Sequence, residues 1–546
     1  MSQAVNTTYA RALRNKALQP VYILEIEGVP TRFSDGPITS PTGSVPEKWM
    51  NNLQGAGAQI TVDEGKSSLG AVTFSLLDKD DKITRMAFQY QLGNRAVTIK
   101  SGFQGMPEEK FVTVVTGRIL DYTLAQDNIN WNFQVVNYLK DEKQDVFKAF
   151  NKLTAPVTAV DVTVNVASTA LFPTATAGVL YVKIEDEVIS YTGTTPTSFT
   201  GCVRGQLGTV AAAHAVDVET TNLVVLQGNP LTLALQILTS TGLGTNGPYD
   251  VLPTCAGLGI DQANIDVTKF ESERDRWLSA VNFRFEEFDK VEGKKFLEEQ
   301  IYTFCNAYPI TDKQGRISIK VYQPPLPSTI AATITDDDLI GPPRFQGNVL
   351  ERYFFNEVDI QYDYDFKTGL YLSRALYEDS TSQVTFGDVR TKAVQSRGFR
   401  TDVTGVNRID NWATRILKRF GIPSPVLKVK AFFNQSLLEP GDIVPLTSAF
   451  VPDLSRGIRG ITNQLMEVVQ VDPNFREATE EFLLLNTGYS YGRKYAAISP
   501  SAQAPTFFPV WTLASATQRL YAFISRKVNA TYGVMSDGSD GYYITP

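Results

Sequence analysis

Apolar and polar residues alternate in short runs along most of this chain. Residues 71–78 (AVTFSLLD) and 95–103 (RAVTIKSGF) are two such runs. Because successive side chains of a strand point to opposite faces, this alternation predicts strands with one buried face. Threonine, valine, tyrosine and phenylalanine, which favour strands, are abundant. We therefore predict a mainly β (α+β) fold.

Helical spacing stands out in only three segments. Residues 229–244 (NPLTLALQILTSTGLG) place apolar side chains at 231, 234, 235 and 238, after Asn229 and Pro230. Residues 294–308 (KKFLEEQIYTFCNAY) and 411–421 (NWATRILKRFG) each carry one apolar face, which in the first extends to Tyr308. We predict one helix capped by Asn229 and ending before Gly242, and two amphipathic helices that lie on sheets.

Length and charge narrow the possible classes of protein. A chain of 546 residues is too long for one hydrophobic core and predicts several domains. Hydrophobic residues make up 43% and charged residues 20%, which are ordinary proportions for folded proteins. The net charge of -7 comes without a basic run, so we expect no sequence-specific nucleic-acid binding. With no secretion signal and no stretch of about twenty apolar residues, we expect folding in the cytoplasm and no stable membrane insertion.

The cysteines fit neither a disulfide framework nor a zinc site. Cys202, Cys255 and Cys305 are widely spaced and odd in number. We expect them to be thiols in the core.

Changes in composition predict five segments. A strand-rich block at 1–154 is followed by a small β module at 155–227, where threonine, alanine and valine predominate. A mixed α/β segment at 228–328 ends in the proline-rich YQPPLPS, and strands return at 329–490. Residues 491–546 form a linker and a C-terminal tail, which is too short for a core of its own.

Residues 199–215 (FTGCVRGQLGTVAAAHA) are the most conspicuous candidate for chemistry. They hold Gly201, Gly205 and Gly208 and the only histidine of the chain. A phosphate-binding loop needs a lysine and a serine or threonine at fixed spacing, and a dinucleotide site needs three glycines in the first turn of a βαβ unit. This stretch has neither pattern. The glycines instead fit turns with positive φ between short strands.

His214 could act as a general base or a metal ligand only with suitable neighbours. The sequence supplies no nucleophile and acid beside it, and only widely separated cysteines as further ligands. We interpret His214 as a turn or edge histidine.

Three acidic clusters are the remaining candidates. Glu185, Asp186 and Glu187 could hydrolyse a glycoside across a cleft, but consecutive strand residues point to opposite faces and favour a solvated hairpin tip. Residues 78–82 (DKDDK) lack the glycine and glutamate of a calcium loop, since Ile83 and Gln89 stand there. Residues 335–339 (TDDDL) fit a solvated turn or a helix start better than a cation site. We assign no catalytic, cofactor-binding or metal-binding residue and no cofactor.

Several stretches resemble virion proteins of tailed bacteriophages. Residues 168–220 resemble a small β module found repeatedly there, in which a hairpin like IEDEVISYTG precedes Phe-x-Gly, Arg-Gly, Gly-Thr and His-Ala. Residues 92–124 look like a segment of tail-tip hub and distal tail proteins, and residues 415–447 are similar to the later half of central hubs.

Two features of the later half can be read from the residues as well. In LEPGDIV, Pro440 and Gly441 predict a tight turn before a strand that starts at Ile443. Residues 463–486 predict two strands joined across 472–476, as in the hubs.

The resemblance implies a fold and a function. Residues 1–154 and 329–490 would be β-barrel-like domains of a structural, non-enzymatic hub at the tail tip or baseplate of a virion. Three chains would form a pseudo-sixfold ring that adapts the hexameric tail tube to a threefold tip. The implied neighbours are distal tail, tail tube and tape measure proteins, tip, fibre or spike proteins, and genomic DNA that passes through without sequence-specific binding.

Two other functions stay open. The inserted module is absent from many hubs and could touch carbohydrate through Tyr181, Tyr191 and Phe199, although these aromatics also fit a packed core. The chain would then be a receptor-binding or distal tail protein. A tail-associated hydrolase is the third reading. A hub predicts a stable trimer, receptor binding predicts affinity for the host envelope, and a hydrolase predicts cleavage of an envelope polymer.

Overall fold

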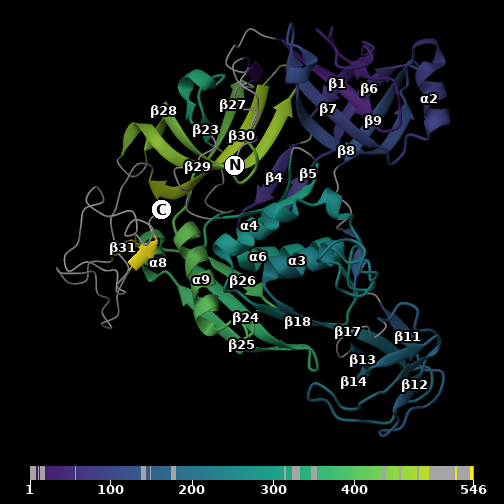
Figure 1. Ribbon diagram of the computed structural model, residues 1–546. Coiled ribbons are helices and arrows are strands. Elements are labelled where there is room, and N and C mark those ends of the chain that lie inside the picture. Colours follow the sequence, from purple (N-terminus) through teal and green to yellow (C-terminus); the bar gives the residue numbers. More distant parts are fainter. Residues whose placement is uncertain are drawn as a thin grey trace, which may run out of the picture.

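The computed structural model is mainly β and multidomain, which confirms the predicted fold class (Figure 1). It describes residues 8–9, 12, 19–55, 57–136, 143–147, 149–173, 180–312, 315–322, 332–345, 353–432, 438–453, 457–475, 477, 479–490, 523–525 and 542–544. The linker at 496–509 and the prolines of YQPPLPS lie outside these residues. Within them, no helix is both long and apolar enough to cross a membrane.

Seven strands near the N-terminus form a sheet that nearly closes on itself, in the order β2-β1-β7-β8-β9-β6-β3. Its two ends meet where Phe33 of β2 forms a bridge with Glu47, shortly before β3. The predicted strands at 71–78 and 95–103 are confirmed as β6 and β7. The elements of this first barrel are β1 (Pro20–Ile26), β2 (Phe33–Ser34), β3 (Met50–Gln54), β6 (Val72–Leu77), η1 (Lys79–Asp81), α2 (Lys82–Tyr90), β7 (Ala96–Phe103), η2 (Glu108–Lys110), β8 (Val112–Leu124) and β9 (Asn130–Val136).

The alternation seen in the sequence packs the inside of this barrel. Val72, Phe74 and Leu76 of β6 are buried and Thr73 is partly exposed. Ser75 is covered as well, and its hydroxyl donates to Asn132 Oδ1 of β9 at 2.8 Å. Phe74 stacks on Phe133 of β9 with ring centroids 5.0 Å apart. Each such apolar side chain contributes about 1.5–3 kcal/mol when it leaves water.

Residues of the C-terminal half form a second, half-open barrel in the order β22-β28-β29-β30-β27-β23. Two strands from the N-terminal block complete this sheet, because β4 pairs with β29 through Gln59↔Gln470 and Ala58↔Val471. The predicted pair at 463–486 is confirmed as β29 and β30. The elements are β4 (Ala58–Thr61), β5 (Lys66–Leu69), β22 (Ile334–Thr335), η7 (Asp336–Asp338), β23 (Arg344–Phe345), β27 (Val426–Phe432), β28 (Ile443–Asp453), β29 (Ile458–Asn474) and β30 (Thr479–Ser490).

The LEPGDIV corner has the predicted form. Gly441 has a φ of 82°, which a glycine adopts without a steric penalty. The Asp442 carboxylate accepts a hydrogen bond from the Glu439 N–H at 2.9 Å, and the Asp442 N–H donates to the Glu439 carbonyl at 3.0 Å. Strand β28 then begins at Ile443.

A mixed layer of helices and small sheets lies below the two barrels in Figure 1. Helix α3 starts at the Asn229 cap, whose side chain accepts from the Leu231 N–H at 3.1 Å, as predicted. Helix α9 covers the sheet of β24, β25 and β26, as expected for an amphipathic helix. The elements are α3 (Pro230–Thr239), η4 (Gln262–Asn264), α4 (Val267–Trp277), β18 (Phe283–Glu287), β20 (Ala307–Thr311), β21 (Ile317–Val321), β24 (Glu357–Asp365), β25 (Leu370–Glu378), α8 (Ser380–Phe386), β26 (Thr391–Gln395) and α9 (Val406–Phe420).

The predicted helix at 294–308 is shorter than expected and contains a π-helical turn. It consists of α5 (Gly293–Phe296), the π-helix η5 (Leu297–Tyr302) and α6 (Thr303–Cys305). Asn306 adopts a left-handed conformation with a φ of 50° and ends the helix, so Tyr308 lies in β20 instead. The apolar side chains of the predicted face are nevertheless all buried.

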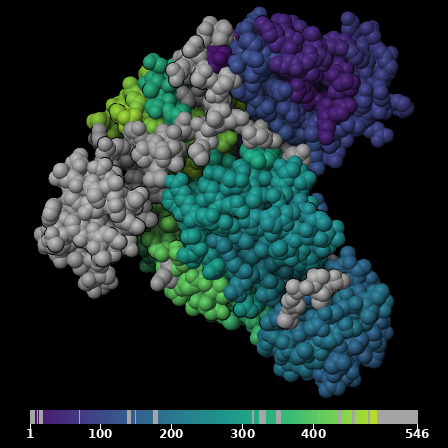
Figure 2. All heavy atoms as spheres, viewed as in Figure 1, coloured from purple at the N-terminus to yellow at the C-terminus, as the bar shows by residue number. Residues whose placement is uncertain are grey.

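The inserted β module projects from this layer (Figures 1 and 2). Strand β17 belongs to the module at its start and pairs with β18 of the mixed layer at its end. Val188 and Leu223 of the module pack against Tyr364 and Phe366 of the β24–β25 hairpin. The elements here are β10 (Asp145–Val146), β11 (Phe150–Lys152), β12 (Thr163–Asn165), β13 (Leu180–Ile184), β14 (Glu187–Tyr191), β15 (Gly193–Thr195), β16 (Ser198–Thr200), β17 (Glu219–Gly228) and β19 (Val291–Glu292); β31 (Phe523–Ser525) and β32 (Tyr542–Ile544) pair near the C-terminus.

Buried charges join the mixed layer to the second barrel. The Glu467 side chain, in β29, is completely buried and binds both Arg419 of α9 and the Tyr308 hydroxyl, which lies 2.6 Å from Glu467 Oε1. Nearby, Lys320 Nζ lies 2.8 Å from Asp442 Oδ1 and 3.2 Å from Glu439 Oε2. Burial lowers the pKa of Lys320, but the two carboxylates outweigh it and the net shift is upward.

Candidate functional site

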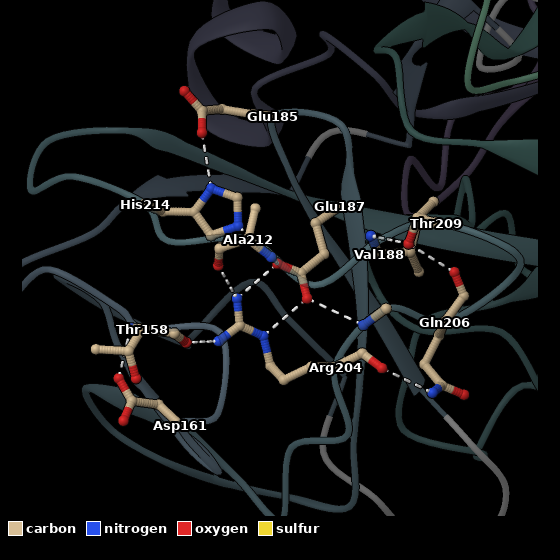
Figure 3. A network of polar contacts seen from close by, with 11 residues as sticks. Thr158, Asp161, Glu185, Glu187, Val188, Arg204, Gln206, Thr209, Ala212 and His214 are labelled. Atoms are coloured by element: carbon tan, nitrogen blue, oxygen red, sulfur yellow. Dashed lines mark hydrogen bonds and ion pairs between the residues drawn. The ribbon is translucent and has the colours of Figure 1, made fainter.

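The conspicuous stretch at 199–215 folds around the tip of the β13–β14 hairpin. Glu185 and Asp186 form the tip, and Glu187 is the first residue of β14. Gly201, Gly205 and Gly208 have φ angles of 61°, 61° and 76°, which confirms their predicted role in turns. These turns bring the loop back over the hairpin, so that side chains distant in sequence meet at Glu187 (Figure 3).

Glu187 is the centre of a buried polar cluster. Its carboxylate accepts hydrogen bonds from Arg204 Nε at 2.8 Å and Nη2 at 2.5 Å, and from the N–H groups of Gly205 and Ala212, each at 3.0 Å. His214 Nε2 lies 2.8 Å from the same group. The carboxylate has about four lone-pair sites, and these donors occupy them. Glu187 therefore has no free position for a substrate.

Arg204 and His214 tie this carboxylate to the rest of the module. Arg204 also donates to the carbonyl oxygens of Thr158 and Ala212. His214 Nδ1 lies 2.7 Å from Glu185 Oε2. The backbone of His214 exchanges two hydrogen bonds with Val157, at 2.8 and 2.9 Å. Three separate segments of the module are thus held at one point.

Two predictions for this region need correction. Glu187 is only 1% exposed and is not part of a solvated hairpin tip, whereas Glu185 and Asp186 are exposed. His214 does lie at a strand-like bridge with Val157, but its ring is buried between two carboxylates. The prediction missed both because the donors that make burial of Glu187 tolerable come 17 and 27 residues later in the chain.

The protonation of Glu187 follows from these contacts. Burial alone would raise its pKa, but the hydrogen bonds from Arg204, Ala212, His214 and Gly205 stabilise the charged form and lower the pKa to about 2. The glycine-rich loop is therefore a cradle for an anion, and that anion is a carboxylate of the same chain. A phosphate has no place in it.

The other candidate residues have structural partners. Asp78 accepts from the Ile83 N–H at 2.8 Å and from Trp131 Nε1 at 3.1 Å. Thr335 and Asp338 form a capping box, which confirms the predicted helix start. Tyr191 and Phe199 are fully buried and their rings pack at 4.7 Å, so they lie in the module core and are not placed to stack on a sugar.

The cysteines are buried free thiols, as predicted. Burial raises the pKa of Cys202 to about 11, which keeps it protonated at neutral pH. Across the described ranges, no three histidine, cysteine, aspartate or glutamate side chains are grouped in a way that could hold a metal ion.

No family model matches this chain, and no curated protein matches it. Among solved structures, it is similar to the 43 kDa tail protein of prophage MuSo2 from Shewanella oneidensis, at 10% identity and a TM-score of 0.35, over 85% of this chain and 96% of that one. The tail protein from Neisseria meningitidis MC58 gives 12% identity and a TM-score of 0.36, over 86% and 97%. Prophage tail protein gp18 from Listeria monocytogenes EGD-e gives 10% and 0.34, over 86% and 95%.

Sequence reasoning did not single out Glu287, a further buried carboxylate at the end of β18. It is 1% exposed, its Oε2 lies 2.5 Å from Arg397 Nη1, and its Oε1 has no hydrogen-bond partner among the described residues. Burial raises its pKa to about 7, although the charge of Arg397 acts in the opposite direction. The alternating run FRFEE could have signalled it, since it places an acid in register with buried phenylalanines.

We expect Glu287 to make the protein less stable as the pH rises through about 7. Its pKa in the folded chain lies above the ordinary 4.5, so the folded state holds this proton more tightly and loses that advantage as the pH rises from about 5 to 8. In Glu287→Gln, the change in unfolding free energy between about pH 5 and 8 should be smaller by about 1–3 kcal/mol. Thermal unfolding across this range, with the exposed Glu109→Gln as control, measures the slope; an unchanged slope in Glu287→Gln contradicts the assignment.

Proposed function

We propose that this chain is a structural protein of a bacteriophage tail and forms the central hub of the tail tip or baseplate. The observation that carries the proposal is the presence of two barrel-like sheets in one chain, β1 to β9 and β22 to β30. Three copies would supply six barrels, which can match a hexameric tube, while the rest of each chain keeps threefold symmetry. The resemblance of residues 92–124 and 415–447 to hub proteins supports the same reading.

The proposed neighbours follow from this position. Tail tube and distal tail proteins would lie above the ring, tip, fibre or spike proteins below it, and the tape measure protein along its axis. Genomic DNA would pass through the ring. The net charge of -7 suits a channel that does not hold phosphates. The polar cluster at Glu187 holds separate segments of the module together, and its donors occupy the carboxylate. This arrangement agrees with a non-enzymatic role.

The mass and symmetry of the purified protein test this proposal. We expect light scattering to give about three times the chain mass of 60.3 kDa, and averaged electron-microscope images to show a ring with a central opening that caps tail tubes. A chain that stays monomeric at high concentration and does not bind tube ends contradicts the hub and favours receptor binding.

A further inference from the structure

Strand β25 is a free edge of the three-stranded sheet in the mixed layer (Figure 1). The strands of this sheet follow the order β25-β24-β26, and no other strand of the described chain pairs with β25. Its exposed face carries leucines at 370, 372 and 376, which are 62%, 70% and 52% exposed. Natural proteins shorten, charge or cover such edges, because an exposed apolar edge pairs readily with other chains. Strand β25 therefore has the features of a strand that is covered in an assembly.

The hydrogen bonds at the end of β25 show which of its backbone groups point to the free edge. The Asp379 N–H donates to the carbonyl of Asn356, directly before β24, at 2.9 Å, so the backbone of Asp379 points toward β24. In a strand, the backbone groups of successive residues point to alternate edges. Every second residue of β25 thus directs its N–H and C=O away from β24. These residues are Leu370, Leu372, Arg374, Leu376 and Glu378, and they are also the ones with exposed side chains.

Strand β26 forms the other edge of the sheet and is free in the same way. The N–H of Ser396, which follows β26, donates to the Gln361 carbonyl of β24 at 2.9 Å. By the same alternation, the residues of β26 at odd positions direct their N–H and C=O away from β24. These residues are Thr391, Ala393 and Gln395, and their side chains are exposed as well.

A polar cleft of about 640 Å³ lies along the free edge of β26. Residues 392–395 of β26 form one wall, and residues of β19, α5 and η5 form the wall opposite. The Arg397 N–H, which points to this edge, donates to Gln300 Oε1 of η5 at 2.9 Å. The opposite wall thus already hydrogen-bonds to the backbone just beyond β26. The cleft leaves the outward N–H and C=O groups of β26 open to an incoming strand.

The charges of the cleft fit the exposed face of β25. Two charged residues of the cleft, Asp289 and Lys295, are exposed and form no ion pair within the described residues. The other charged residues that line it have partners. Strand β25 carries one group of each sign, Arg374 and Glu378, and 66% of the Arg374 side chain is exposed although it pairs with Asp359. A balanced pair of charges favours a protein strand over a polyanion.

The two edges are geometrically complementary in a threefold ring. Strand β25 runs antiparallel to β24, and β26 runs parallel to β24. A rotation about an axis along the strands preserves their directions, so β25 of a second copy placed beside β26 would form an antiparallel pair. Such a rotation also keeps the same face of every sheet outward. This condition is met, because at both edges the outward backbone groups belong to residues with exposed side chains.

We propose that β25 of one copy of this chain enters the cleft beside β26 of the next copy and pairs with it as an antiparallel strand. This inference rests on the proposed trimeric hub and names the surfaces that join its chains. The contact is heterologous, and three such contacts close a ring of three sheets below the barrels. The leucines of β25 would be covered by the exposed face of β26 and by the aliphatic stems of Lys290 and Lys295.

Substitutions at the two edges test the pairing. Leu372→Glu should weaken trimer formation by at least about tenfold, because it places a charge where the contact covers a leucine. Leu243→Glu is the matched control, since Leu243 is 77% exposed and lies outside this sheet and this cleft. Ala393→Pro should weaken the trimer similarly, because it removes an N–H that points to the cleft and none that bonds to β24. Sedimentation at several concentrations measures association, and circular dichroism confirms that each variant is folded.

Disulfide formation between copies gives an independent readout. Ala393→Cys is combined in one chain with Leu372→Cys, Arg374→Cys or Leu376→Cys in turn, and at least one pair should give disulfide-linked multimers on oxidation. Each single variant should not, because the native cysteines are buried. Within one chain β24 separates the two edges by two strand spacings, about 9.5 Å, which is beyond the reach of a disulfide. A crosslink must therefore join two copies.

The outcomes separate this inference from the proposed function. A wild-type chain that never forms a trimer contradicts the hub itself. A wild-type trimer whose Leu372→Glu and Ala393→Pro variants associate as tightly as Leu243→Glu overturns the strand pairing and leaves the hub intact. Failure of all three double-cysteine chains to crosslink within a stable trimer has the same meaning.

Discussion

Replacing Glu467 with alanine is expected to lower the free energy of unfolding by about 3–5 kcal/mol. The Glu467 side chain is buried between β29 and the mixed layer, where its two oxygens bind Arg419 and the Tyr308 hydroxyl. Only 8% of the Arg419 side chain is exposed, so the variant would leave its charge in the interior without a counter-ion. Burial opposes the charge on Arg419, but Glu467 raises its pKa overall, so the guanidinium cannot escape the cost by losing its proton.

A double-mutant cycle separates the pair from its surroundings. Arg419→Met should be destabilising alone, and Arg419→Met with Glu467→Leu should recover a large part of the loss, because apolar side chains of similar volume can replace a buried ion pair. The control is Glu481→Ala, which removes a carboxylate from the Lys428–Glu481 pair of the same sheet. These side chains are 41% and 39% exposed, so its effect should stay within about 1 kcal/mol.

Urea denaturation followed by hydrogen exchange in β29 and α9 gives the local free energy, since a chain with several domains need not unfold in one step. Equal losses of unfolding free energy in Glu467→Ala and Glu481→Ala would contradict this prediction. They would show that the contact between the mixed layer and the second barrel does not depend on the Glu467–Arg419 ion pair. Tyr308→Phe, which removes only one hydroxyl, should cost about 1 kcal/mol.

The features that the sequence predicted are those with local causes. The cap at Asn229, the turn at Gly441 and the hairpin of β29 and β30 each depend on residues within a few positions of one another. Alternation likewise predicted which faces of β6 and β7 are buried. Such interactions can be read from one stretch of chain because their partners stand beside them.

The features that escaped prediction depend on pairings over long distances. Nothing in residues 58–69 indicates that β4 joins a strand that begins about four hundred positions later, because strand pairing leaves no mark on either strand alone. Burial of Glu467 and Glu187 could not be predicted for the same reason, since an acid in an alternating run is exposed unless a cation from elsewhere meets it. The domain boundaries at 154, 227, 328 and 490 stay predictions.

The second large effect is expected in the inserted module, where Glu187→Ala should unfold the module locally and leave the barrels folded. The change removes the acceptor for two bonds of Arg204, for the N–H groups of Gly205 and Ala212, and for His214 Nε2. Only 7% of the Arg204 side chain is exposed, so its charge becomes buried and unpaired. We expect the free energy of unfolding of the module to fall by about 3–5 kcal/mol. A module of this size has a small core, so this loss is a large part of its stability.

Acid should reproduce the effect of this mutation. The folded-state pKa of Glu187 is about 2 and the ordinary value is 4.5, so the stability that its charge provides is present above pH 4.5 and is lost as the pH falls toward 2. Hydrogen exchange across the module, compared with the first barrel, should show opening at neutral pH in Glu187→Ala and only in acid in the wild type.

Asp186→Ala is the matched control for Glu187→Ala, because Asp186 is an exposed acid at the adjacent position of the same hairpin. It should leave exchange in the module unchanged, which separates loss of the cluster from loss of a negative charge. If Glu187→Ala exchanges as slowly as Asp186→Ala, the module is held by its apolar core alone. In that case Arg204 and His214, within residues 199–215, would need a role other than their hydrogen bonds to Glu187.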